Sequence, residues 1–117
     1  MFSALLRSLV LFISCMTVMA SASEPVFVPR ASQVAPNVYA IVGPLGQRST
    51  ANAGLNANYG FIVAPNGVIL IDSGASAYGA AMLEAAVKQV STQPIRWVLN
   101  TGSQDHRWLG NDYFAKK

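Results

Sequence analysis

The chain has few cysteines and few charged residues. Only 11% of its 117 residues are Asp, Glu, Lys or Arg, and it has one Cys and one His. Cys15 lies in the apolar N-terminal segment, and no cysteine follows it, so no disulfide can stabilise the rest of the chain. A domain of this size must then depend on its hydrophobic core alone, which leaves little margin.

Clustered positive charge is also lacking. The formal net charge is +3, and Lys and Arg are scattered except for Lys116 and Lys117 at the end of the chain. A surface that follows a nucleic-acid backbone needs cations gathered on one face. We therefore expect no nucleic-acid partner.

The N-terminus has the pattern of a secretory signal peptide. Arg7 precedes an apolar run, which ends in the small residues Ala20-Ser21-Ala22. This pattern predicts a signal peptide over residues 1–22 and a mature domain over residues 23–117. The apolar run is too short for a membrane span, so we expect a periplasmic or secreted protein with no stable span after cleavage.

The clearest structural signal is the segment "YGFIVAPNGVILIDSG". Two apolar runs flank Pro65-Asn66-Gly67, which predicts a β-hairpin. Both runs are apolar at nearly every position, and this pattern predicts strands that are buried on both faces. The preceding segment "NVYAIVG" also indicates a strand, and residues 44–58 between them indicate a loop.

The second half alternates helix and strand. Leu83, Ala86, Val87 and Val90 have helical spacing, which predicts a helix over residues 77–91. "IRWVLN" predicts another buried strand, parallel to residues 68–72 through a crossover. One helix covers only one face of a sheet, so the pattern indicates part of a larger α/β sandwich. Its exposed sheet face predicts self-association or a partner chain.

Asp72, at the end of the hairpin, allows several interpretations. "LIDSGAS" matches the catalytic loop of aspartic proteases, whose chemistry needs two carboxylates that share a proton, here from two copies of Asp72 in a dimer. A helix follows the motif, however, where that family has a strand. The plainest interpretation is an Asp that caps this helix. A dinucleotide site is disfavoured because the glycine spacing is wrong.

The segment "WVLNTGSQDHRWLGNDYF" resembles the signature region of the metallo-β-lactamase fold hydrolases. In that family a strand ends in Asn-Thr, and His-x-His-x-Asp-His, Gly-Asn and an aromatic residue follow. The upstream segments "NVYAIVG", "NYGFIVAPNGVILIDSG" and "IRWVLNT" occur in the family's order. The resemblance covers about Val38 to Phe114. It implies a mixed α/β (α+β) fold, the N-terminal portion of an αββα sandwich.

The metal motif departs from the family's pattern. Gly102 and Gln104 stand at the two leading His positions, His106 stands at the Asp position, and Arg107 stands at the last His position. Zinc needs three or four donors, and only Asp105 and His106 are good donors here.

Three accounts of this region remain open. Asp105 and His106 are catalytic residues that bind zinc in an altered geometry, with Asp72 and Gln104 holding them in place. Alternatively, the domain has kept its fold without a metal. In the third account His106 is a non-metal base oriented by Asp72 or Asp105. A surface or helix-capping histidine is the plain alternative. Arg48, in the long loop, is a candidate contact for an anionic substrate, although a solvated loop is the favoured explanation because loops are exposed by default.

The resemblance implies an exported hydrolase in which a zinc-held water attacks an ester, thioester or amide-like small-molecule substrate. The family's further ligands would lie beyond Lys117, so we expect this stretch of chain alone to be an inactive fragment. The alternatives are a metal-free, non-catalytic binding module of the same fold and a dimeric aspartic protease that uses Asp72.

Overall fold

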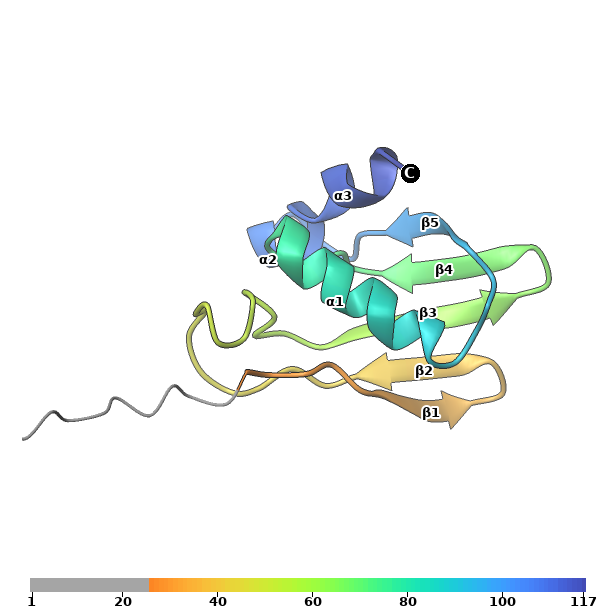
Figure 1. Cartoon of the computed structure of the whole chain (residues 1–117), viewed down its shortest axis with the longest axis horizontal. Helices are drawn as coiled ribbons and strands as arrows, with labels where there is room; N and C mark the ends of the chain where they lie inside the picture. Colours follow the sequence, from red (N-terminus) through yellow and green to blue (C-terminus); the bar gives the residue numbers. More distant parts are fainter. Residues whose placement is uncertain (1–25) are drawn as a thin grey trace, which may run out of the picture.

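A computed structural model describes residues 26–117, so the predicted signal peptide, with Cys15, lies outside the described residues. Five strands form one sheet, and their order across the sheet is their order along the chain (Figure 1). The strands are β1 (Ala31–Ala35), β2 (Val38–Ile41), β3 (Tyr59–Ala64), β4 (Gly67–Ile71) and β5 (Ile95–Leu99). The first four are antiparallel neighbours, and β5 is parallel to β4, as predicted.

The β3–β4 hairpin is confirmed. Its turn is Pro65-Asn66, and Gly67 has φ 148°. A Cβ on Gly67 would lie 2.7 Å from the Arg96 side chain and 3.1 Å from the Pro94 carbonyl oxygen. Glycine is therefore required here both by the backbone and by the close approach of the chain that leads into β5.

Helix α1 (Ala77–Lys88) begins at Ser76, whose Oγ accepts a hydrogen bond from the Gly79 amide at 2.9 Å. The expectation that Asp72 caps this helix is wrong. The helix also ends three residues before the predicted residue 91. The amides of Val90 and Ser91 both donate to the Val87 carbonyl, which closes the last turn and leaves Val90 exposed.

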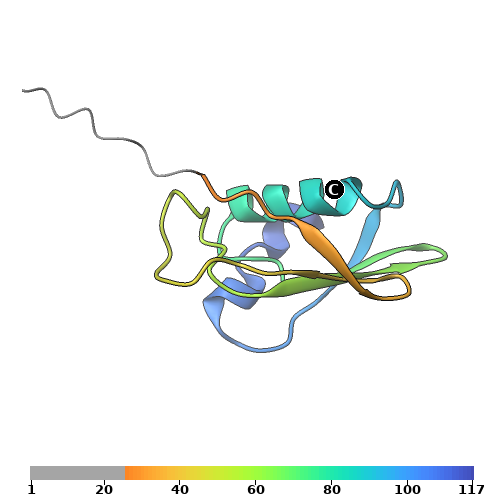
Figure 2. The same cartoon turned by 90° about the horizontal axis from the view of Figure 1, so that it is seen from below.

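The core lies between α1 and one face of the sheet (Figure 2). Its fully buried members come from the helix, the three central strands and the long loop: Ile41, Leu55, Phe61, Val68, Leu70, Leu83 and Val87. Burying one such aliphatic or aromatic side chain contributes about 1.5–3 kcal/mol. Two short helices, α2 (Asp105–Trp108) and α3 (Asn111–Ala115), follow β5, and α3 packs against α1.

The opposite face of the sheet is apolar and only partly covered by residues 26–117, because Thr101 and Arg107 lie against its end near Ile62 and Ile71. We call it the open face. Strand register places on it Val38, Ala40, Ile62, Ile69, Ile71, Trp97 and Leu99. Trp97 is 49% exposed and Leu99 is 53% exposed. The prediction that the hairpin strands β3 and β4 are buried on both faces is therefore wrong for the described chain, as is the prediction that β5 is a buried strand.

The mixed α/β class is confirmed by this arrangement of one sheet and its covering helix. In residues 26–117, no helix has the length and apolar character needed to cross a membrane.

Candidate functional site

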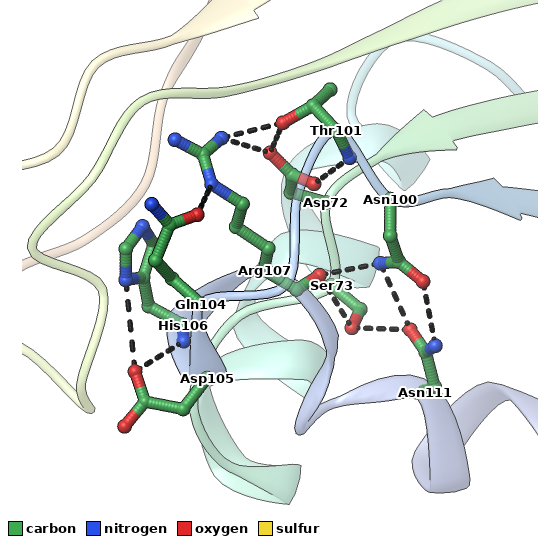
Figure 3. Close-up of polar contacts among 9 residues, drawn as sticks. All are labelled: Asp72, Ser73, Asn100, Thr101, Gln104, Asp105, His106, Arg107 and Asn111. Carbon is green, nitrogen blue, oxygen red and sulfur yellow. Dashed lines mark hydrogen bonds and ion pairs between the residues drawn. The ribbon is translucent and has the colours of Figure 1, made fainter.

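The polar residues singled out in the sequence gather at one edge of the sheet. Strands β4 and β5 are parallel, so the segments that follow them leave from the same edge. Figure 3 shows the side chains that meet there. We call them the rim cluster: Asp72, Ser73, Asn100, Thr101, Gln104, Asp105, His106, Arg107 and Asn111. The structure therefore brings together all four predicted site residues, Asp72, Gln104, Asp105 and His106.

Asp72 is the buried centre of the rim cluster. Its carboxylate accepts hydrogen bonds from the Thr101 amide at 2.8 Å and the Thr101 hydroxyl at 2.7 Å. Arg107 Nη1 lies 3.1 Å from Asp72 Oδ2 and forms an ion pair with it. Asp72 has φ 61°, a left-handed conformation that Asp adopts more readily than most residues. This conformation turns the chain sharply after β4.

Arg107 is held from several sides. Its Nε donates to Gln104 Oε1 at 2.8 Å, and Nη1 donates to the Thr101 hydroxyl as well as to Asp72. The Arg107 carbonyl accepts from the Ser73 amide at 2.9 Å. These bonds fix both the backbone and the guanidinium, so Arg107 is part of the rim rather than a solvated surface cation.

The segment after β5 contacts the end of β4 through Asn100, Gly110 and Asn111. The amides of Asn100 and Asn111 bond to each other, at 2.7 and 3.2 Å, and Ser73 Oγ donates to Asn111 Oδ1 at 2.7 Å. A Cβ on Gly110 would lie 2.0 Å from the Ser73 carbonyl oxygen. Only glycine allows this approach, so these residues have a structural role.

Asp105 and His106 lie on the outer side of the rim cluster. Asp105 Oδ2 forms an ion pair with Arg48 Nη1 at 2.8 Å, and Oδ1 accepts from the His106 amide at 2.7 Å. His106 Nδ1 lies 3.7 Å from Asp105 Oδ1. The hydrogen bond from Arg48 is the main cause that lowers the pKa of Asp105. Arg48, the candidate contact for an anionic substrate, is thus already paired with a carboxylate.

These donors do not fit the predicted zinc ion. Among residues 26–117, no three His, Cys, Asp or Glu side chains form a group that could hold a metal. Both carboxylates of the rim cluster face a guanidinium, Asp72 that of Arg107 and Asp105 that of Arg48. A ligand carboxylate would have to give up this partner before it could bind zinc.

Tyr59 is a residue of this region that the sequence analysis missed. Its side chain is 4% exposed, and its hydroxyl is the buried side-chain atom that lacks a hydrogen-bond partner among the described residues. Burial, and then the charge of Asp72, raise the pKa of Tyr59 to about 12 against the opposing effects of Arg48 and Arg107. Counting outward from the Pro65-Asn66 turn places Tyr59 opposite Asp72, so the hairpin register could have revealed it.

In comparisons with known proteins, no protein-family model matches the chain, and no curated protein matches it.

Proposed function

We propose that the chain is an exported, metal-free binding module of metallo-β-lactamase-like fold that holds a small molecule at the rim cluster. The observation that carries this proposal is the ion pair between Arg107 Nη1 and Asp72 Oδ2 at 3.1 Å. Where the resembled family has a metal-ligating histidine, this chain has a cation that is part of the protein. The periplasmic or secreted location rests on the predicted signal peptide.

Electrostatics supports the metal-free proposal. Two unit charges of like sign about 4 Å apart repel by about 4 kcal/mol at an effective dielectric constant of about 20, and a divalent ion doubles this. Arg107 is anchored by Asp72, Thr101 and Gln104, so it cannot move away without breaking several hydrogen bonds. A zinc ion beside Asp72 would therefore be opposed by a fixed positive charge.

The second candidate is the metal-dependent hydrolase of ester, thioester or amide-like substrates. It is favoured by one observation, the convergence of Asp72, Asp105 and His106 on the same rim (Figure 3). It would need further metal donors from outside the described residues, and both carboxylates would have to exchange a guanidinium for the metal.

The dimeric aspartic protease receives less support. Its mechanism requires two carboxyl groups that face each other and share a proton. Both oxygens of Asp72 instead point at donors within the same chain, from Thr101 and Arg107. The helix α1 after the motif also differs from the strand that this family has there.

Zinc content tests the proposal. The purified chain is expressed in zinc-replete medium and dialysed, and its metal is measured by mass spectrometry. We expect far less than one zinc per chain and a melting temperature that a chelator leaves unchanged. Stoichiometric zinc that is lost in His106→Ala would overturn the proposal and support the hydrolase. Cleavage of peptides at acid pH that is abolished by Asp72→Asn would support the protease.

A further inference from the structure

A groove follows one edge of the sheet. Strand β5 is the last strand in the sheet order, so one of its edges has no partner strand among residues 26–117 (Figure 1). Two cavities, of about 620 and 250 Å³, lie along this edge. Both are lined by the same residues of β5 and α3: Ile95, Arg96, Trp97 and Phe114. We call the two cavities together the edge groove.

The backbone of β5 offers hydrogen bonds to an occupant of this groove. N–H and C=O groups of a strand point toward both of its neighbours, so about half of those in β5 point away from β4. Strand β4 pairs with the inner edge in a parallel ladder. No described residue forms a backbone hydrogen bond with the outer edge. An extended peptide that lies along β5 would pair with these groups and continue the sheet.

The side chains around the edge groove carry an excess of positive charge. Lys88, Arg96 and Lys117 are far apart in the sequence, but all three line the larger cavity. In the described chain, Glu84 is the one acidic residue that lines this cavity, and it pairs with both lysines. Arg96 forms no ion pair with another described residue. Three cations thus share one carboxylate, and the groove favours a negatively charged partner.

The two sides of the sheet differ at this edge. Lys88 lies on α1, and Lys117 Nζ is 2.6 Å from Glu84 of the same helix, so both ammonium groups lie on the helix side. Trp97 and Leu99 lie on the open face, where each is about half exposed. Side chains of a strand point alternately to the two sides of a sheet. A peptide beside β5 would therefore place every second side chain near the lysines and the others beside Trp97.

We propose that the edge groove binds an extended peptide in which acidic and apolar residues alternate. The peptide adds to β5 as a further strand. Its carboxylates face Lys88 and Lys117 on the helix side, and its apolar side chains extend the open face beside Trp97. The larger cavity shares no residue with the rim cluster, so this inference does not rest on the proposed metal-free function.

Charge selects such a peptide over a second copy of the chain. If β5 paired with β5 of another copy, two Arg96 side chains and the lysines of both copies would meet at one interface. Like charges on neighbouring strands destabilise a sheet. Charged residues at a sheet edge commonly prevent edges of identical chains from pairing. An acidic strand avoids this repulsion and gains ion pairs instead.

Fluorescence anisotropy with labelled, terminally blocked heptapeptides tests the inference on the purified chain. The probe alternates Glu and Val. One control peptide alternates Lys and Val, and the other has the composition of the probe with its Glu and Val residues in two blocks. We expect both controls to bind at least about tenfold more weakly than the probe, and added salt to weaken the probe's binding. Equal binding of the three peptides would overturn the inference.

Backbone pairing is tested by N-methylation of the probe. In an extended strand the amides of alternate residues point to the same edge, so methylating the Glu amides and methylating the Val amides block opposite edges. One methylated peptide should lose binding because its blocked edge faces β5. The other should bind as the probe does because its blocked edge faces solvent. The same affinity for both methylated peptides, whether high or negligible, would contradict strand addition.

Three variants locate the charges. Lys88→Gln, Arg96→Gln and Lys117→Gln should each weaken binding of the probe about threefold, the effect of an exposed ion pair, and the triple variant about thirtyfold. The matched control is Lys116→Gln, at an exposed lysine that pairs with Asp112 and does not line the edge groove. It should bind the probe as the parent chain does. A folded triple variant with the affinity of the parent chain would place the peptide elsewhere.

Other occupants of the edge groove give different results. If a second copy of the chain fills the groove, it competes with the probe, and the binding curve flattens as the protein concentration rises. If the groove is a site for small anions, succinate binds as tightly as the probe and displaces it. Either result would overturn the peptide partner.

Discussion

Arg107 of the rim cluster and Arg48 of the neighbouring loop form ion pairs that differ in how far their carboxylates are exposed to water. The Asp72 side chain is 4% exposed in its pair with Arg107, whereas Arg48 and Asp105 are 43% and 46% exposed in theirs. Water can replace the lost partner of an exposed charge, but it cannot reach a buried one. The stability of the rim should therefore depend on Arg107 and hardly on Arg48.

Arg107→Met should lower the free energy of unfolding by about 3 kcal/mol, because it leaves the buried Asp72 carboxylate without its cation. The control Arg48→Met should lower it by less than about 1 kcal/mol. Urea denaturation followed by tryptophan fluorescence measures both. Equal losses in the two variants would contradict the different burial of the two pairs.

Tyr59 should limit stability in alkaline solution. Its pKa is raised from 10.0 to about 12 in the folded chain, mainly by burial. The folded state therefore resists deprotonation of Tyr59 more than the unfolded state does. The corresponding stability is complete below pH 10 and is lost as the pH rises through 12.

Melting temperatures between pH 9 and 12 (about the range set by these two values) test this effect in the parent chain and in Tyr59→Phe. The variant should lose less stability over this range. Tyr78→Phe, at an exposed tyrosine, is the control and should follow the parent chain. Parallel curves for the parent chain and Tyr59→Phe would contradict the prediction.

At the residue scale, the sequence predicts which side chains meet but not how they pair. Asp72, Asp105 and His106 could be placed at one edge because parallel strands end together. The pairing of Asp72 with Arg107 depends on the path of the loop between β5 and α2. Such a loop has no regular spacing of apolar residues, so the sequence could not predict which arginine pairs with each carboxylate.

At the scale of elements, Glu84 joins α1 to α3 and to the residues after it. It accepts hydrogen bonds from the Tyr113 hydroxyl and from Lys117 Nζ, both at 2.6 Å, and pairs with Lys88 at 3.1 Å. The pair with Lys88 is the i,i+4 contact that helical spacing predicts. The contacts with Tyr113 and Lys117 cross from one element to another and have no such signal.

Acid should weaken the contacts that Glu84 makes between α1 and the C-terminal residues. Burial alone would raise the pKa of Glu84, but the hydrogen bonds from Lys117, Tyr113 and Lys88 lower it to about 2 from 4.5. The stability that they contribute is complete above pH 4.5 and is lost as the pH falls through 2. Unfolding free energies from pH 5 down to 2 (about these limits) should fall more steeply in the parent chain than in Glu84→Gln.

The control for Glu84 is Asp112→Asn, which removes an exposed carboxylate of α3 that pairs with Lys116, the residue directly after this helix. The free energy of unfolding of this variant should fall with decreasing pH as steeply as that of the parent chain. An equal flattening of the acid profile in both variants would show that general charge repulsion, rather than the contacts of Glu84, causes the loss.

Strands β2 to β5 and helix α1 were predictable because their apolar residues follow a regular pattern, whereas the mostly exposed β1 and the layers that cover the sheet were not. The same apolar run describes a strand covered on both faces and a strand covered on one. That ambiguity produced the error for β5. The predicted helix end was wrong because Val90 continues the spacing, while the backbone turns at Val87.

At the scale of the whole molecule, the open face predicts self-association. Trp97 and Leu99 are about half exposed on an apolar sheet face that the described residues cover only in part. Exposed apolar patches of this kind commonly mark contacts between chains. We expect the purified chain to form dimers or larger species in sedimentation experiments, and the double variant Trp97→Lys, Leu99→Lys to be monomeric.

A matched control changes two apolar side chains that are exposed away from the sheet, Leu45→Lys with Tyr78→Lys. These changes add the same charge without altering the open face, so this variant should associate as the parent chain does. A parent chain that stays monomeric at all concentrations tested would contradict the prediction.

The strand order also has a consequence for how the molecule is assembled. Neighbours in the sheet are successive strands in the chain, and the hairpins β1–β2 and β3–β4 can form by short-range pairing, which is fast. Asp72 meets Thr101 and Arg107 only after the crossover has returned, across separations of 29 and 35 residues. In pulse-labelled refolding, the Thr101 amide should gain protection later than that of Phe61. The contacts at this edge of the sheet would then be the last to form during folding and the first to break during unfolding.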